Sequence, residues 1–332
     1  MHLKYNLSKK ILAWYDNNKR PLPWRVSKRS QKKLYYRLLS EFMLQQTQVK
    51  TVIPYFKKFI VKLPTLESLS KSNERKILKL WEGLGYYRRA RNLFATSKIL
   101  VKEKKSKLPK SLEEIKELPG IGEYTANALL GLVYNQPTIA IDGNVKRVFS
   151  RILNKTESKI NFKKFIELNK KFLFNTKRNS DFVEALMEFG ALICKPKEPK
   201  CNICYIKSAC KYFNSSNKII TTKFKVMKNK NYDIFCYLNK NKQIALTKNN
   251  NLGFLNKFSL PQIKETKRNN KKDWKFLNRY QNSISNKKLN INLYYKFSKK
   301  IPASFTWHSI KKNKEFVPNF TKKIFKQVST IF

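Results

Sequence analysis

The chain has 332 residues, 41% of them apolar and 13% aromatic, which is enough to bury hydrophobic cores and excludes a disordered basic protein. Its 72 lysines and arginines exceed its 21 acids by 51, so a polyanionic partner is expected, although part of this charge reflects a composition rich in lysine throughout. No apolar run reaches membrane-spanning length and the N-terminus does not resemble a signal peptide, so we expect a cytoplasmic protein that binds no membrane.

The first two thirds of the chain predict a helical domain. Apolar residues recur at helical spacing in residues 5–18 and again from Leu34 to about Thr47. The pattern Asp181-x-x-Glu184 predicts a capped helix that runs to Leu192. Other helices are predicted at about 49–62, 65–71, 73–81, 87–104, 143–153 and 160–174.

Glu41 lies beside the apolar stripe of the helix that begins at Leu34. It is either a solvated partner of Arg37 one turn earlier or a carboxyl group buried at the rim of a pocket, and the spacing fits both. The polar cluster Gln45, Gln46 and Thr47 ends this helix. Such residues are common at frayed helix ends, but amides can also enter a duplex and bond to base edges after a base has left the stack.

Two glycines precede two tyrosines in the segment Gly83–Tyr87. The two tyrosines could form a core pair that a loop covers. Alternatively, Tyr86 points outward and acts as a wedge between base steps of DNA, and inserting such a wedge costs about a few kcal/mol of base stacking. The basic side chains of Arg88, Arg89 and Arg91 follow directly and fit contacts with phosphates.

The segment Leu118–Gly122 predicts a tight turn between two helices, the first of which carries the capping pattern Ser111-x-x-Glu114. Gly120 and Gly122 allow a sharp turn and a close approach to another surface. The N–H groups that begin the second helix would then form an anion site, and a DNA phosphate is the expected anion.

Asp142 stands at the start of a further predicted helix, in the segment Ile139–Arg147. A helix N-cap would by itself explain an aspartate there. Lys146, on the same helix, is a nearby amine that we include among the candidate DNA-binding residues.

Four cysteines follow the pattern C-x6-C-x2-C-x5-C and predict a metal site rather than disulfides in a cytoplasmic protein. Four thiolates with one close pair fit either zinc or a [4Fe–4S] cluster. Zinc ribbons usually have two C-x-x-C pairs, and this segment has one. The residues are Cys194, Cys201, Cys204 and Cys210.

The last third of the chain predicts an α+β domain at 223–332 that follows a linker at 214–222. Alternating patterns predict strands at 232–238, 243–247 and 290–297, with Cys236 as a buried apolar residue of the first strand. Helices are expected at 273–284 and 320–331.

Several of these segments carry a resemblance to a known family. The string SEFMLQQTQVKTVIPYF at 40–56 strongly resembles the MutY-type adenine DNA glycosylases, and LPGIG followed by IDGNVKR resembles the helix-hairpin-helix DNA glycosylases in general. The resemblance implies that Glu41 is the catalytic acid, that Gln46 inserts near the damaged base, and that Asp142 faces the sugar of an extruded nucleotide. It also favours Tyr86 as the wedge. Tyr124 occupies the position of the lysine that cuts the strand in bifunctional relatives, and a phenol cannot form the required Schiff base.

The resemblance extends to the cysteines and to the C-terminal domain. It implies a [4Fe–4S] cluster on the four cysteines, which organises a basic loop within a glycosylase domain at 1–213. The segment Asn251–Pro261 is similar to MutY C-terminal domains, which share the fold of nucleotide pyrophosphohydrolases but here lack the glutamate cluster of a hydrolase. In the family a Phe-Ser-His loop reads the damaged guanine. Phe297 and Ser298 match this loop, and Lys299 replaces the histidine, which puts the strictness of lesion recognition in question.

These observations predict a monomeric, monofunctional glycosylase that removes adenine opposite 8-oxoguanine (or guanine) in double-stranded DNA. A two-lobed helical domain of the helix-hairpin-helix type would carry the chemistry. Burial of Glu41 would keep it protonated near neutral pH, Asp142 would stabilise the cationic sugar, and Tyr124 would line the pocket. Three alternatives stay open: an endonuclease III-like glycosylase and lyase on oxidised pyrimidines, a non-catalytic protein that binds lesion DNA, and, as the weakest, a zinc-binding regulator.

Overall fold

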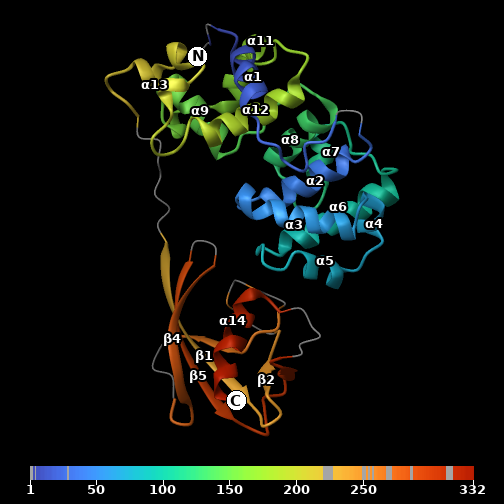
Figure 1. Ribbon diagram of the computed structural model, residues 1–332, viewed down its shortest axis with the longest axis vertical. Helices are drawn as coiled ribbons and strands as arrows, with labels where there is room; N and C mark the ends of the chain where they lie inside the picture. The colour runs from blue at the N-terminus through green and yellow to red at the C-terminus, as the bar shows by residue number, and fades with distance from the viewer. Residues whose placement is uncertain are drawn as a thin grey trace. The chain divides into compact units, whose positions relative to one another are not determined.

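The computed structural model describes residues 3, 5–27, 30–219, 227–248, 252, 255, 258–266, 271–284, 287–311 and 317–332. The chain forms two compact units, one of residues 1–80 and 86–223 and the other of residues 81–85 and 224–332 (Figure 1). In the described part of the chain, no helix is long and apolar enough to cross a membrane.

The first unit is helical, and its helices form two groups (Figure 1). One group contains α1 (Leu7–Asn18), α9 (Gly143–Leu153), α10 (Phe162–Leu168), α11 (Lys170–Leu173), α12 (Asn179–Leu192) and α13 (Lys211–Asn214). The other contains α2 (Lys33–Leu44), α3 (Val49–Lys62), α4 (Leu66–Ser70), α5 (Glu74–Leu80), α6 (Arg88–Glu103), α7 (Leu112–Glu117) and α8 (Glu123–Tyr134).

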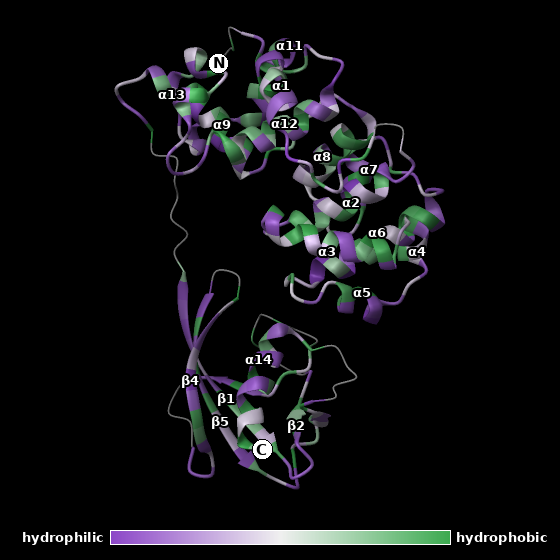
Figure 2. Ribbon diagram, viewed as in Figure 1, coloured by the Kyte–Doolittle hydropathy of each residue, from purple (hydrophilic) through white to green (hydrophobic). Residues whose placement is uncertain are grey.

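Each helix group is held by side chains on its inner faces. Figure 2 shows hydrophobic and hydrophilic residues alternating along the helices, as expected when each helix buries one face. Trp14 of α1 packs edge-on against Phe189 of α12 at 5.2 Å between ring centroids. Helix α8 packs against α2 of one group and α12 of the other, so it joins the two groups. The helical domain is therefore two-lobed, as predicted.

Two of the predicted helices differ from the structure. The helix expected at 160–174 is divided into α10 and α11, because the buried amide of Asn169 accepts from Leu3 N (2.6 Å) and donates to Phe165 O (2.7 Å). Helix α12 begins two residues before Asp181 and has no side-chain cap. Asp181 instead accepts from Arg178 in the first turn, at 2.8 Å.

Among the described residues of the second unit, six strands form a mixed sheet in the order β4-β5-β1-β2-β6, with β3 also paired to β1. Strands β1 and β5 are parallel, and the other pairs are antiparallel. Helix α14 (Asn319–Val328) packs on one face, where Cys236 is fully buried as predicted. The strands are β1 (Lys228–Leu238), β2 (Gln243–Leu246), β3 (Gln262–Glu265), β4 (Lys275–Ile284), β5 (Lys287–Phe297) and β6 (Thr306–Ser309).

The prediction of a helix at 273–284 is wrong, because this segment forms β4. Tyr280 and Ile284 are four residues apart, a spacing that places residues on one face of a strand as well as on one face of a helix. Pairing with β5 along almost its whole length then decides the conformation. Of the segment 251–261, which was matched to MutY C-terminal domains, residues 251, 253, 254, 256 and 257 lie outside the described residues.

Candidate active site

Glu41 is a buried carboxyl group on α2, and only 5% of its surface is exposed. Burial raises its pKa to about 7. The cation of Arg37 and a hydrogen bond with Tyr124 hold the pKa below the value that burial alone would give, while the charges of Glu184 and Asp142 raise it further. Glu41 is therefore protonated in a large fraction of molecules at neutral pH.

Arg37 is not the solvated partner that sequence spacing allowed. Its guanidinium is buried and donates to both carboxylate oxygens of Glu184, at 2.5 and 3.1 Å. Arg25 and Tyr15 donate to the same carboxylate, each at 3.1 Å. Arg25 and Arg37 both stabilise the ionised form of Glu184, so the pKa of Glu184 is lowered although the residue is buried. Sequence analysis missed this ion cluster, which joins Tyr15, Arg25 and Arg37 to a residue that lies 147 or more positions later in the chain.

Asp142 is the N-cap of α9, and its carboxylate accepts from Val145 N and Asn144 Nδ2, both at 2.7 Å. Burial raises its pKa, and these hydrogen bonds act in the opposite direction. The same carboxylate raises the pKa of Glu41 and of the Tyr124 hydroxyl by charge repulsion. Asp142 therefore caps α9 and also interacts electrostatically with Glu41 and Tyr124. Its interpretation as a helix N-cap is thus compatible with its interpretation as a site residue.

Tyr124 stands in the first turn of α8, directly after the hairpin. Its hydroxyl lies 3.3 Å from Met187 Sδ and also forms a hydrogen bond with the Glu41 carboxyl group. Burial raises the pKa of this hydroxyl well above its usual value, with further contributions from Glu41 and Asp142. The phenol therefore stays neutral and can act as a hydrogen-bond donor.

A second set of contacts leads from Asp142 toward the cysteines. Asn144, which donates to Asp142, accepts from Arg147 Nη2 at 2.8 Å. Arg147 also donates to Gly190 O (2.7 Å) and to Cys194 O (2.8 Å). The amine of Lys146 lies over the ring of a phenylalanine on α10, at 5.9 Å from its centroid.

The hairpin between α7 and α8 is held closely against α6. Gly120 has a φ of +78°, and a Cβ there would lie 2.4 Å from the side chain of Asn92, so both the backbone and the contact require glycine. Thr96 Oγ1 donates to Pro119 O at 3.0 Å. Gly122 is the N-cap of α8, with free space where a side chain would stand.

The amide loop, residues Gln45–Thr47, begins where α2 ends at Leu44, three residues earlier than predicted. Gln45 Nε2 donates to Gly120 O at 3.4 Å, which places the loop beside the hairpin. Gln46 is exposed and has a left-handed φ of +56°. Thr47 Oγ1 donates to Gln45 O at 3.3 Å.

Tyr86 and Tyr87 have different environments. Tyr86 is 42% exposed with a φ of +48°, whereas Tyr87 is 5% exposed and belongs to the core. Arg88 is exposed, and Arg91 pairs with a glutamate of α5 at 2.6 Å. Arg89 is buried and donates to backbone carbonyl groups at the end of α2, so the prediction that it contacts phosphate is wrong.

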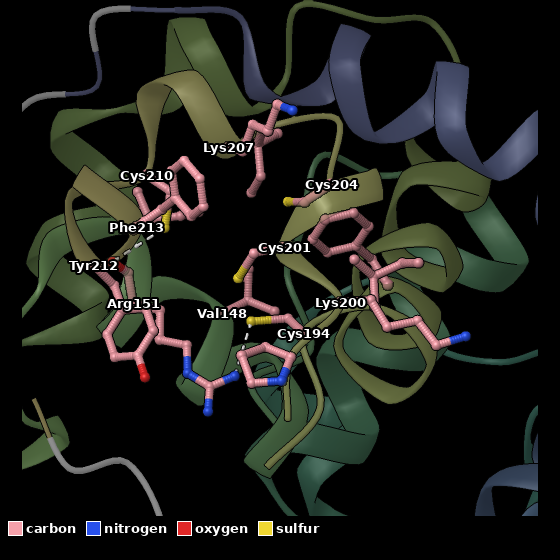
Figure 3. Close-up of a pocket in the computed structure, with 15 residues that line it drawn as sticks. Val148, Arg151, Cys194, Lys200, Cys201, Cys204, Lys207, Cys210, Tyr212 and Phe213 are labelled. Atoms are coloured by element: carbon pink, nitrogen blue, oxygen red, sulfur yellow. Dashed lines mark hydrogen bonds between the residues drawn. The ribbon is translucent and has the colours of Figure 1, made fainter. Parts of the chain in front are cut away.

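The four cysteines predicted to bind a metal are brought together at the ends of α9, α12 and α13. Figure 3 shows the sulfur atoms of Cys194, Cys201, Cys204 and Cys210 turned toward a common space, and all four residues line one pocket. Arg151 Nη1 donates to Cys194 Sγ at 3.5 Å and lowers the pKa of that thiol, although burial has the larger effect and raises it. Among the described residues, no three or more Cys, His, Asp or Glu side chains are arranged to hold a single metal ion.

Phe297 and Ser298 follow one another at the end of β5. Phe297 is 51% exposed, and its ring contacts that of Phe332. Ser298 donates to Lys300 O at 2.5 Å, and Lys299 is exposed. The two residues that match the family's reading loop are thus available at a surface of the second unit.

Comparisons with known proteins agree with the geometry of the helical unit. Residues 39–171 match the model of the HhH-GPD superfamily base excision DNA repair proteins. The adenine DNA glycosylase of Buchnera aphidicola subsp. Baizongia pistaciae is 41% identical over 305 residues, which cover 85% of this chain and 83% of that protein. The chain belongs to the adenine DNA glycosylases. The rat member of this family is 39% identical over 210 residues, which cover 60% of this chain and 40% of that protein.

Solved structures show the same helical fold. A thermostable thymine-DNA glycosylase has a TM-score of 0.55 and 28% identity, and the match covers 62% of this chain and 94% of that one. An endonuclease III–DNA complex has a TM-score of 0.50 at 19% identity, which supports the fold alone. The fold of the helical unit is therefore that of the HhH-GPD superfamily, whose model residues 39–171 match.

Proposed function

We propose that this chain hydrolyses the N-glycosidic bond of adenine paired with 8-oxoguanine, or with guanine, in double-stranded DNA and leaves the strand uncut. The observation that carries the proposal is the coupled trio of Glu41, Tyr124 and Asp142, in which one carboxyl group is buried with a pKa of about 7. A base excision enzyme needs a proton donor and a fixed negative charge within one site, and the trio supplies both.

The reaction starts when an extruded adenine accepts the proton of Glu41 on a ring nitrogen. Protonation turns adenine into a better leaving group, and the bond between C1′ and the base breaks with its electron pair moving to the base. The sugar becomes cationic, and the carboxylate of Asp142 stabilises it electrostatically. A water molecule then adds to C1′ and gives one proton to the ionised Glu41, which restores the acid and leaves an abasic site.

DNA binding is assigned to the loops that surround the trio. The N-terminus of α8 behind Gly120 and Gly122 offers backbone N–H groups to a phosphate. In this proposal the amide loop fills the space of the extruded base, and Tyr86 acts as a wedge in the stack. Arg88 and Lys146 add positive charge for the backbone.

The second unit, with a boundary near residue 223, is proposed to recognise the lesion through Phe297 and Ser298. Lys299 keeps a charge for phosphate but cannot reproduce the acceptor of a neutral histidine ring. We therefore expect weaker discrimination between 8-oxoguanine and guanine than a histidine would give. We also propose that the enzyme is a cytoplasmic monomer, since its substrate is duplex DNA and one chain supplies all the proposed catalytic groups.

We propose that Cys194, Cys201, Cys204 and Cys210 hold a [4Fe–4S] cluster. The four sulfur atoms face one pocket, and the segment has only one of the two C-x-x-C pairs that zinc ribbons usually have, which favours a cluster over zinc. The cluster would anchor the loop from Cys194 to Cys210 against α9. The chain's own residues, Glu41 and Asp142, supply the acid–base chemistry.

Release of adenine from duplexes that contain adenine opposite 8-oxoguanine, guanine or thymine tests the proposal. We expect single-turnover release with the first two, and a loss of about 10²–10⁴-fold for Glu41→Gln, the usual contribution of a general acid. Glu103→Gln, an exposed residue at the end of α6, is the matched control and should keep the wild-type rate. An unchanged rate for Glu41→Gln would contradict the proposal.

The endonuclease III-like alternative requires an amine that forms a Schiff base with the sugar. Borohydride trapping on a thymine-glycol duplex separates the two activities, because only the lyase gives a covalent protein–DNA product. We expect no trapped product from the wild-type chain, since Tyr124 occupies the position of the nucleophile.

A further inference from the structure

Helix α6 contacts three of the segments that we assign to DNA binding: Tyr86, the amide loop and the hairpin. Tyr86 lies two residues before its first residue, and Arg89 in its first turn reaches the end of α2. One turn further along, Asn92 packs against Gly120 of the hairpin, and Thr96 bonds to the hairpin backbone. The residue that joins the most of these contacts is Arg89.

A single nitrogen of Arg89, Nη1, donates to three carbonyl groups at the end of α2: Phe42 O (3.1 Å), Met43 O (2.7 Å) and Gln45 O (2.6 Å). The last carbonyl groups of a helix lack partners within it and carry the negative end of the helix dipole, so a cation there binds favourably. The acceptor Gln45 O belongs to the first residue of the amide loop, which fixes the direction in which the chain leaves the helix.

The same guanidinium lies over the ring of Tyr86, 5.5 Å from the ring centroid. Tyr86 and Gln46 are both non-glycine residues with left-handed backbones, at φ +48° and +56°. Such conformations cost free energy and persist where the surroundings hold them. Arg89 contacts the backbone beside one of these residues and the side chain of the other, and it is itself only 7% exposed.

We propose that Arg89 is a positioning residue that holds Tyr86 and the amide loop in one fixed arrangement, so that both enter the duplex together as the target base is extruded. This inference rests on the proposed function, because it takes the DNA-contacting roles of these two segments as given. Arg89 touches no reacting atom and acts through its neighbours. Lysine is not equivalent here, since a flexible ammonium group lacks the planar face that stacks on the tyrosine ring.

A double-variant cycle with Arg89→Lys and Tyr86→Leu tests the proposal in the full-length protein. We expect Arg89→Lys to slow single-turnover adenine release about tenfold, equivalent to ~1.4 kcal/mol of transition-state stabilisation. The double variant should be about as slow as the slower single variant, because both changes break the same contact. Arg75→Lys, the same change at an exposed arginine of α5, should keep the wild-type rate.

A second measurement separates positioning from general support of the fold. In the Glu41→Gln background, 2-aminopurine at the target position reports base unstacking by its fluorescence, and no excision is needed. We expect Arg89→Lys to remove most of the fluorescence increase. In the protein that keeps Glu41, the same substitution should leave the pH midpoint of excision at the wild-type value, and the variant should remain folded at the assay temperature. Arg89→Gln, which buries no charge, takes its place if Arg89→Lys does not fold.

Multiplicative rate losses in the cycle, or a normal fluorescence increase in the Arg89 variant, would overturn the proposal. A shift of the pH midpoint would also overturn it, since that would mean that Arg89 acts on Glu41. Because the fluorescence measurement requires no base release, a failure of the proposed glycosylase activity is seen separately, as a wild-type protein that unstacks the base but releases no adenine.

Discussion

Replacing Tyr124 with phenylalanine should move the alkaline limit of adenine excision to higher pH. The hydrogen bond from Tyr124 favours the ionised form of Glu41 and so holds the pKa of this carboxyl group down, at about 7. Phenylalanine has nearly the same shape and cannot donate a hydrogen bond. Without the bond the pKa of Glu41 rises, and the acid stays protonated to a higher pH.

The size of the effect follows from the energy of one hydrogen bond. A bond to a charged group contributes about 1.5–3 kcal/mol, and one pKa unit corresponds to 1.36 kcal/mol. Neighbouring groups can partly replace the lost hydrogen bond, which reduces the increase in the pKa of Glu41. We therefore expect this pKa to rise by about one unit, from about 7 to about 8. At its ordinary pKa of 4.5, only about 0.3% of Glu41 would be protonated at pH 7, compared with about half at a pKa of 7.

The assay is the single-turnover rate of adenine release between pH 5 and 10. Activity should fall as the pH rises through the pKa of Glu41, and the midpoint of this fall should be higher in Tyr124→Phe than in the wild type. Tyr134→Phe makes the same change at the other end of α8, where the hydroxyl bonds to Leu108 O, and should leave the midpoint unchanged. A midpoint that stays in place or moves to lower pH would refute the assignment of Glu41 as the acid.

Three other changes test separate parts of the molecule. Asp142→Asn keeps an N-cap acceptor but loses the charge, so we expect excision to fall about 10²–10³-fold in single-turnover assay while the thermal unfolding midpoint changes little. Gly120→Ala should lower the free energy of unfolding by about 1–2 kcal/mol or more in urea titration, because its φ of +78° is strained and its Cβ would collide with Asn92, whereas Gly143→Ala meets open space and should not. Lys299→His should increase the ratio of excision opposite 8-oxoguanine to excision opposite guanine, and an unchanged ratio would contradict a reading role for this loop.

The sequence predicted helices and strands well where the spacing of apolar residues fits only one of the two, helix or strand. Helix α9 has the predicted bounds, and its N-cap was predicted from Asp142 alone, because capping depends on neighbouring residues. Strand β4 was mistaken for a helix because its apolar spacing fits both periods and only the pairing with β5 decides between them. Local patterns are therefore sufficient for isolated helices but not for segments whose conformation depends on distant partners.

The candidate catalytic residues could be proposed from sequence because they lie in recognisable motifs, but their surroundings could not. Glu184 was taken for a helix-capping residue, although it binds Arg37, 147 positions earlier in the chain. Arg89 was assigned to the surface with its neighbours, and only the packing of α6 against the end of α2 shows that it is buried. Such long-range pairs follow from tertiary structure and leave no local spacing to detect.

The buried arginines of this protein limit which of its basic residues can be replaced. Among the described residues, the buried basic side chains are all arginines, namely Arg37, Arg89, Arg147 and Arg151, and none is a lysine. Each one satisfies several carbonyl or carboxylate oxygens at once, which the guanidinium fork does better than an ammonium group. Surface lysines other than Lys146 and Lys299 can therefore be exchanged to adjust solubility or salt sensitivity, whereas these four interior positions resist the same exchange.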